Sequence, residues 1–165
     1  MSGTPTAVTA AADYVVTAGN VTGSTPSVTT TGALTYQRRL GVATVLPNGR
    51  VLATGGSIEW NVMNNVAYDA EIWTPATGVW TRGAPAQLAR LYHSVALLLP
   101  DARVLSAGGG LCGAGCSANH PDLQIYTPHY LINDDGTDAV RPVIASAPAQ
   151  ATHGTLVDVT TDSPI

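Results

Sequence analysis

The sequence contains no lysine and no phenylalanine, and only 11% of its 165 residues are charged. All seven basic residues are therefore arginines, and the formal net charge is −4. Surfaces that bind nucleic acid are rich in clustered basic residues. Because the arginines here do not cluster and the net charge is negative, no nucleic-acid partner is predicted.

Long apolar runs are also missing. No apolar run reaches the roughly 18 residues that a transmembrane helix requires, so no membrane span is predicted. The first residues, Met1 to Ala11, lack the basic start and apolar core of a signal peptide. Only two cysteines are present, Cys112 and Cys116, too few for a four-ligand zinc site. A short-loop disulfide is the simplest interpretation and implies an oxidising compartment; a redox pair is the alternative, although no βαβ pattern surrounds it.

The residues that dominate are Gly, Pro, Thr, Ala and Val, a composition typical of strands and turns. Residues 42–56 and 95–109 are identical at nine of fifteen positions, with an offset of 53 residues (95 − 42). The same offset places residues 70–75 on residues 123–128. A constant offset across two separated blocks indicates a repeated structural unit.

Each repeat is predicted to run strand, tight turn, strand, Gly-Gly, long loop, strand. The first strand is apolar on both faces, so we expect it to be buried on both sides. In the turn of the second repeat Ala102 replaces Gly49, and an identical turn would strain Ala102 by roughly 1–2 kcal/mol. Trp80 is expected on a fourth strand, Gly78 to Arg82.

Four-stranded units of roughly 40–50 residues are typical of β-propeller blades, and a propeller needs about 4–8 of them. We therefore predict an all-β chain with two kelch-type blades in residues 36–140, and expect it to be a fragment of a longer protein. Residues 141–165 are predicted to begin another β-domain, with a strand over residues 154–160.

The N-terminal residues 1–35 are expected to be an incomplete upstream segment or linker. Within them, Tyr14 to Ala18 is predicted as a short strand, and Ser24 to Gly32 as a polar loop.

Tyr92 and His93, just before the apolar strand of the second repeat, are the main candidates for chemistry. The first repeat has Arg39 and Leu40 at these positions, so the repeat itself does not demand the pair. Neighbouring residues of a regular strand point to opposite faces, so the two side chains converge only if the backbone is irregular. A phenol and an imidazole facing one pocket suit copper(II), iron or zinc. The alternative is that both side chains only pack and hydrogen-bond at a sheet edge.

The remaining polar candidates are predicted to be structural. His120 is expected to hydrogen-bond within a loop, and His129 and His153 to be exposed. Asp134 and Asp135 are expected to form a turn.

A known family shares these motifs. The block from Arg90 to Leu105, followed by Gly108 to Gly113, Cys116, Asn119-His120 and Ile125 to Leu131, resembles the galactose oxidase and glyoxal oxidase family of copper-radical oxidases. The resemblance covers roughly residues 36–165. It implies a kelch-type propeller and an immunoglobulin-like C-terminal domain entered at Arg141 to Ile144, in a secreted or extracellular protein that is a monomer when full length. It also implies copper, O2, and an alcohol, sugar or aldehyde substrate that is oxidised with release of H2O2.

The resemblance further implies roles for individual residues. Tyr92 corresponds to the axial tyrosine, a weak copper ligand and the base for the substrate hydroxyl. His93 corresponds to one of two equatorial histidine ligands, and Cys112 with Cys116 to the family's short-loop disulfide. The cross-linked tyrosyl-cysteine radical cofactor and the second histidine are expected outside this chain, so the isolated chain is expected to be inactive. The alternative is a non-catalytic kelch-type module that binds carbohydrate or protein.

Overall fold

The computed structural model describes residues 14–17, 27–110 and 115–162. Within these residues every regular element is a β-strand except one 3-10 helix, η1 (His129–Leu131), so the predicted all-β class is confirmed. The chain forms two compact units, residues 1–126 and 127–165. The division lies earlier than the predicted boundary near Val140, and the assignment of residues 141–165 to an immunoglobulin-like domain stays a prediction.

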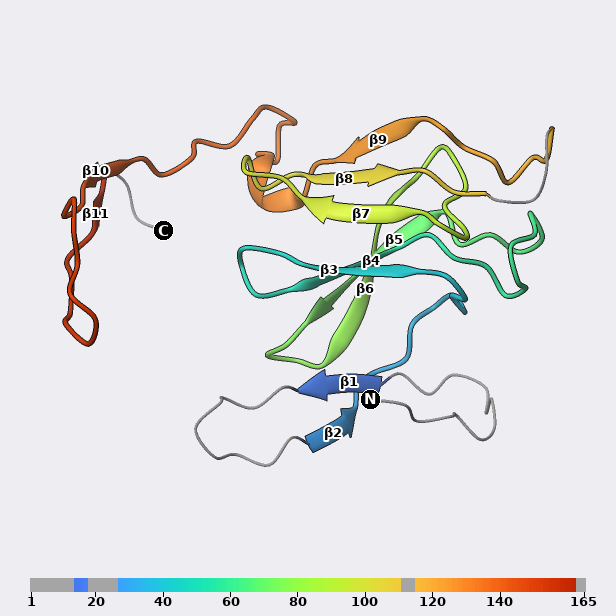
Figure 1. Cartoon of the computed structure of the whole chain (residues 1–165), viewed down its shortest axis with the longest axis horizontal. Helices are drawn as coiled ribbons and strands as arrows, with labels where there is room; N and C mark the ends of the chain where they lie inside the picture. The colour runs from blue at the N-terminus through green and yellow to red at the C-terminus, as the bar shows by residue number, and fades with distance from the viewer. Residues whose placement is uncertain (1–13, 18–26, 111–114, 163–165) are drawn as a thin grey trace. The chain divides into compact units, whose positions relative to one another are not determined.

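The first repeat forms a four-stranded antiparallel sheet, here called the first sheet (Figure 1). Its strands are β3 (Val42–Val45), β4 (Val51–Thr54), β5 (Asp69–Thr74) and β6 (Val79–Pro85). The predicted fourth strand with Trp80 is therefore confirmed.

The second repeat forms a three-stranded antiparallel sheet, the second sheet. Its strands are β7 (Val95–Leu98), β8 (Val104–Ala107) and β9 (Leu123–Tyr126). The registers of the two sheets match at the predicted offset: Thr44 pairs with Leu52 in the first, and Leu97 with Leu105 in the second.

The two tight turns are also the same. In the first, Leu46 N–H donates to Arg50 O at 2.8 Å and Gly49 N–H to Leu46 O at 2.9 Å. The corresponding bonds of the second turn, made by Leu99 and Ala102, have the same lengths. Gly49 has φ +77° and Ala102 φ +66°, so the predicted left-handed alanine is confirmed.

The sheets differ in how they are buried. Leu52 and Ile72 lie in the core, on the face of the first sheet that Thr44 shares. Thr44 Oγ1 approaches Ala96 O of the second sheet at 3.5 Å. Burial of the first strand on both sides was predicted wrongly: Val45 on β3 is 66% exposed and Leu97 on β7 is 55% exposed.

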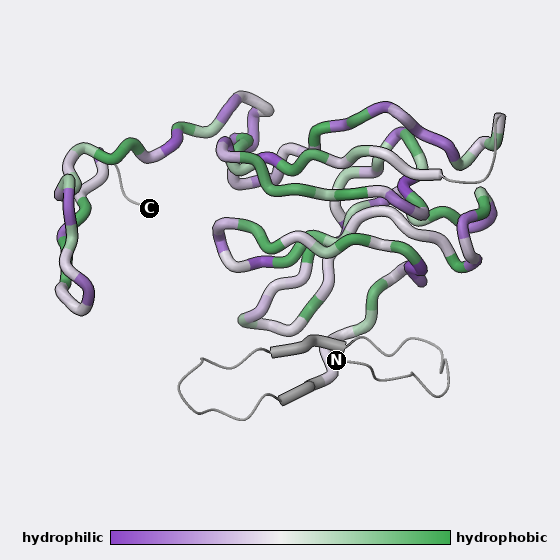
Figure 2. Tube along the Cα trace, viewed as in Figure 1, coloured by the Kyte–Doolittle hydropathy of each residue, from purple (hydrophilic) through white to green (hydrophobic). Residues whose placement is uncertain are grey.

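For Leu97 the reason is that, among the described residues of the first unit, no other sheet packs against the outer face of the second sheet. Figure 2 shows that the chain along β7 is apolar. The exposed members of the face are Val95, Leu97, Leu123 and Ile125.

Two short hairpins complete the described chain. Strands β1 (Tyr14–Thr17) and β2 (Ser27–Thr30) pair antiparallel; the first was predicted, whereas the second lies where a loop was expected. In the second unit, β10 (Ile144–Ser146) pairs with β11 (Thr160–Thr161). Residues 154–160 were predicted as a strand, but only the last of them belongs to one. The predicted turn at Asp134 and Asp135 is present, closed by a hydrogen bond from Gly136 N–H to Asn133 O at 2.9 Å.

Candidate metal centre

Tyr92 and His93 are the two central residues of a tight turn that leads into β7. Ser94 N–H donates to Leu91 O at 3.0 Å across this turn. His93 has φ +62°, a left-handed conformation that breaks the alternation of a strand. As a result the two rings stack, with centroids 3.8 Å apart and planes inclined by 26°. The irregular backbone that convergence requires is therefore present.

The residues just before the turn anchor it in the interior. Leu91 is only 1% exposed and lies in a small apolar cluster with Ala89 and Ala118. Arg90 is 2% exposed, and its NH1 donates to Gly108 O at 3.0 Å and pairs with the Asp122 carboxylate at 2.9 Å. These contacts fix the chain immediately before the Tyr92–His93 pair.

The first sheet has a similar anchor with one residue fewer. Arg38 NH1 donates to Gly55 O at 2.7 Å, the position equivalent to Gly108. Leu40 has φ +64° and is the counterpart of His93. The arginines are 52 residues apart (90 − 38), whereas the left-handed residues are 53 apart (93 − 40). The second repeat therefore carries one extra residue between its anchor and its left-handed turn.

Trp60, on the loop between β4 and β5, forms one wall of the site and was not predicted. Its ring centroid lies 5.1 Å from that of Tyr92, with the planes inclined by 44°, and Trp60 is 59% exposed. The repeat pattern carries no signal for it, because the contact joins the loop of one repeat to the turn of the other.

The side chains of Tyr92 and His93 offer two donor atoms to a metal. A phenol oxygen and an imidazole nitrogen are donors that copper(II) accepts, and both stand on one turn, with Tyr92 half-buried and His93 exposed. No group of three or more His, Cys, Asp or Glu side chains that would hold a metal occurs in residues 14–17, 27–110 and 115–162. The pair thus fits part of a copper site, as two ligands that need others.

The other candidate residues, which are histidines and cysteines, have roles different from that of the Tyr92–His93 pair. His120 is mostly buried; its backbone N–H donates to Gly109 O at 3.0 Å, and its side-chain Nδ1 lies 3.8 Å from the Asp122 carboxylate. His129 and His153 are exposed, as predicted. Cys116 is described but Cys112 lies outside the described residues, so the disulfide stays a prediction.

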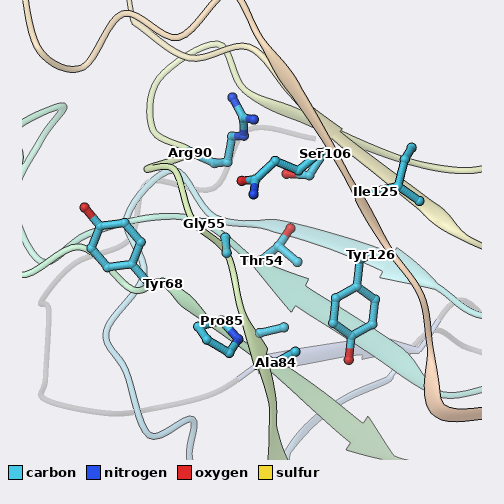
Figure 3. A pocket seen from close by; sticks show the side chains of 12 residues that line it. Thr54, Gly55, Tyr68, Ala84, Pro85, Arg90, Ser106, Ile125 and Tyr126 are labelled. Atoms are coloured by element: carbon cyan, nitrogen blue, oxygen red, sulfur yellow. The ribbon is translucent and has the colours of Figure 1, made fainter. Parts of the chain in front are cut away.

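A pocket lies between the two sheets, with a volume of about 70 Å³, room for several water molecules. Figure 3 shows Arg90 and Ser106 at one end and Pro85 and Tyr126 at the other. Burial raises the pKa of the Tyr126 phenol. Neither Tyr92 nor His93 lines this pocket, so it is not the metal centre.

Comparison with known proteins gives related sequences along most of the chain. A scan against protein-family models finds no match. A galactose oxidase of Gibberella zeae is 37% identical over 156 residues, which cover 92% of this chain and 23% of the relative. Aldehyde oxidase GLOX1 of Arabidopsis thaliana is 33% identical over 129 residues, 70% of this chain and 20% of the relative.

A solved structure is similar as well. It is a fungal alcohol oxidase of the AA5 family in complex with copper, with a TM-score of 0.79 and 35% identity, and the match covers 93% of this chain and 32% of that one. The chain thus spans about a quarter of the length of the curated relatives that it matches. Among the described residues no helix is long and apolar enough to cross a membrane.

Proposed function

Because this chain belongs to the galactose oxidase and glyoxal oxidase family, we propose that it is part of a copper-radical oxidase. The whole protein would oxidise a primary alcohol, sugar or aldehyde with O2 and release H2O2. The observation that carries the proposal is the stacked pair of Tyr92 and His93 on one turn. The first sheet has Arg39 and Leu40 at the same positions, so the fold does not require the pair.

In this proposal the two side chains have different tasks. The His93 imidazole would donate a nitrogen to the metal, and the Tyr92 oxygen would be a weaker ligand that accepts the proton of the substrate hydroxyl. Bound copper supplies a Lewis acid and a one-electron acceptor. Trp60 covers the Tyr92 ring on one side and limits the access of water to it.

The remaining groups come from outside the chain. We expect the tyrosyl-cysteine radical and the second histidine ligand from other parts of the whole protein, together with further kelch-type blades and the rest of an immunoglobulin-like domain. The purified chain loaded with copper should therefore make peroxide from a primary alcohol no faster than free copper does. Faster production by the chain alone would contradict this division of the site.

Copper binding is the sharper test. Copper(II) titrated into the chain and followed by calorimetry and electron paramagnetic resonance should bind with a nitrogen ligand. Tyr92→Phe and His93→Ala should each weaken binding by more than about tenfold, since the loss of outer partners alone can cost that much. Tyr68→Phe and His153→Ala change the same residue types elsewhere and should leave the affinity unchanged. Equal losses in the controls would overturn the assignment.

Secretion and the Cys112–Cys116 disulfide belong to the same proposal. Alkylation of the chain expressed in an oxidising compartment should label neither cysteine before reduction and both after it. Labelling before reduction would contradict the disulfide.

A second function, a non-catalytic module that binds carbohydrate or protein, is favoured by one observation. The loop after β4 exposes several large apolar side chains, which are Ile58, Trp60, Val62 and Met63, and exposed apolar patches mark binding surfaces. If copper affinity does not depend on Tyr92 and His93, whereas Trp60→Ala abolishes binding to a carbohydrate array, this second function replaces the oxidase.

A further inference from the structure

The backbone around Tyr92 differs from its counterpart in the first sheet at one pair of hydrogen bonds. In the first repeat, outside the strands, Arg39 and Ser57 form a direct bridge: Arg39 N–H donates to Ser57 O at 2.8 Å, and Ser57 N–H donates to Arg39 O at 3.1 Å. The offset of 53 residues places Tyr92 on Arg39 and Gly110 on Ser57. The same bridge would therefore join Tyr92 to Gly110.

Only half of that bridge is made directly. Gly110 N–H donates to Tyr92 O at 2.7 Å. Tyr92 N–H donates instead to Oδ1 of Asn61 at 3.3 Å, and Asn61 Nδ2 donates to Gly110 O at 3.0 Å. The amide group of Asn61 thus stands between the donor and the acceptor that are directly bonded in the first sheet.

Asn61 follows Trp60, whose ring contacts Tyr92. One dipeptide of the β4–β5 loop therefore touches Tyr92 twice, with a ring on its ring and an amide on its backbone. Asn61 itself has φ +47°, a region that asparagine enters more readily than most residues. The loop is thus shaped to present this side chain.

The other end of the amide contact is equally fixed. Gly110 has φ +132°, and a Cβ built on it would lie 2.1 Å from Oδ1 of Asn119. A side chain at this position would collide with Asn119, so the backbone of Gly110 passes close by and its carbonyl is held toward Asn61.

We propose that Asn61 is a positioning residue for Tyr92. The Asn61 amide takes the place of a direct hydrogen bond between Tyr92 N–H and Gly110 O. It thereby holds the turn at a distance from the backbone of Gly110 and fixes where the Tyr92 ring meets Trp60 and His93. The relevance to copper rests on the proposed function, whereas the positioning itself can be measured without metal.

The test is hydrogen exchange at the Tyr92 amide of the whole chain, measured without copper. Asn61→Gly removes the side chain while keeping the left-handed backbone, and should speed exchange at Tyr92 by about three- to tenfold, which corresponds to one ordinary hydrogen bond. Exchange at Arg39 should not change, since its bridge lacks Asn61. Asn64→Gly is the matched control, because Asn64 lies on the same loop and bonds the Glu59 side chain.

Asn61→Asp serves as the conservative variant. It keeps an oxygen for the Tyr92 N–H and should retain the slow exchange, whereas it loses the donor to Gly110 O. Unchanged exchange in Asn61→Gly, or equal acceleration in Asn61→Gly and Asn61→Asp, would overturn the inference. If Asn61→Gly does not fold, slow exchange at Tyr92 in Asn61→Asp supports the inference and fast exchange rejects it.

Copper affinity then separates this inference from the proposed function. If the wild-type chain binds copper through Tyr92 and His93, Asn61→Gly should weaken that binding by about threefold or more, and unchanged affinity would show that the amide does not position the ligand. If the wild-type chain does not bind copper there, the proposed function fails, and the exchange rates alone still decide whether Asn61 holds Tyr92.

Discussion

The first and second sheets are built on one plan, yet only the second carries a pair of potential metal ligands. They share strand register and turn geometry. Each also has a buried arginine that donates a hydrogen bond to the carbonyl of the first residue of its Gly-Gly pair, Gly55 in one and Gly108 in the other. They differ by one residue between that arginine and the left-handed turn. The anchoring arginine thus lies one residue further from the turn in the second repeat, whereas Tyr92 and His93 occupy the positions of Arg39 and Leu40 in a turn with the same left-handed residue.

The same comparison extends to one residue on the third strand of each sheet, whose side chain accepts a backbone hydrogen bond from the loop that precedes the sheet. Glu71 Oε1 accepts the Thr35 N–H at 2.6 Å, and Gln124 Oε1 accepts the Leu88 N–H at 3.2 Å. These pairs are again 53 residues apart (88 − 35 and 124 − 71). In the first sheet the carboxylate also pairs with Arg38 at 2.9 Å, and both side chains are almost fully buried.

The largest difference between the sheets is expected from removing these acceptors. Glu71→Ala leaves the buried Arg38 charge without its carboxylate and should lower the free energy of unfolding by about 3–5 kcal/mol. Gln124→Ala removes a neutral acceptor and should cost about 1–3 kcal/mol. Urea denaturation of the whole chain measures both, and equal losses would contradict the distinction.

The sequence predicted much of the fold because the repeat is local. The offset of 53 residues gave the strands, the turns and the left-handed Ala102 from matching letters alone. It also singled out Tyr92 and His93 as residues that the repeat does not need. It could not predict Trp60 or Asn61, because their contacts join different repeats and depend on the path of a loop without periodicity.

Burial was predicted least well, because it too depends on contacts between segments that are far apart in the sequence. An apolar strand is buried only where another layer covers it, and sequence pattern does not say whether that layer is present. Leu97 is therefore a residue of a type common in protein cores, yet it is more than half exposed.

Core truncations at equivalent positions should reveal this asymmetry. Leu52 is fully buried, and Leu52→Ala should cost about 2–5 kcal/mol. Its counterpart Leu105 is only half-buried, so Leu105→Ala should cost less than half as much. The order should reverse at the next position back, where Val104 is fully buried and Val51 is half-buried. Thermal or urea unfolding of the four variants checks the crossed order, and a uniform cost at all four sites would refute it.

Exchanging the turn residues should give a smaller and opposite pair of effects. Ala102→Gly relieves a left-handed alanine and should stabilise the chain by roughly 1 kcal/mol, whereas Gly49→Ala should destabilise it by roughly 1–2 kcal/mol. The backbone hydrogen bonds are the same in both turns, so they cancel in the comparison. Equal signs for the two substitutions would mean that the turns differ in solution.

The smallest expected effect concerns a cluster that only the first sheet possesses. Asp69 accepts a hydrogen bond from the Tyr36 hydroxyl at 2.5 Å and pairs with Arg82; position 89, the counterpart of Tyr36, is an alanine. The hydrogen bond from Tyr36 and then that from Arg82 lower the pKa of Asp69. A carboxylate with a lowered pKa adds stability above its unfolded pKa, about 3.9, and loses it as the pH falls through the folded value.

Asp69→Asn should therefore reduce the melting temperature slightly at pH 6, and the difference from wild type should shrink as the pH falls from the unfolded pKa of about 3.9 through the lowered folded pKa. The effect should be small because Arg82 is largely exposed and exposed pairs contribute little. Asp158→Asn removes the same charge from an exposed residue and serves as the control. A difference between Asp69→Asn and wild type that is unchanged between pH 6 and pH 3 would show that the Asp69 carboxylate does not stabilise the first sheet through its charge.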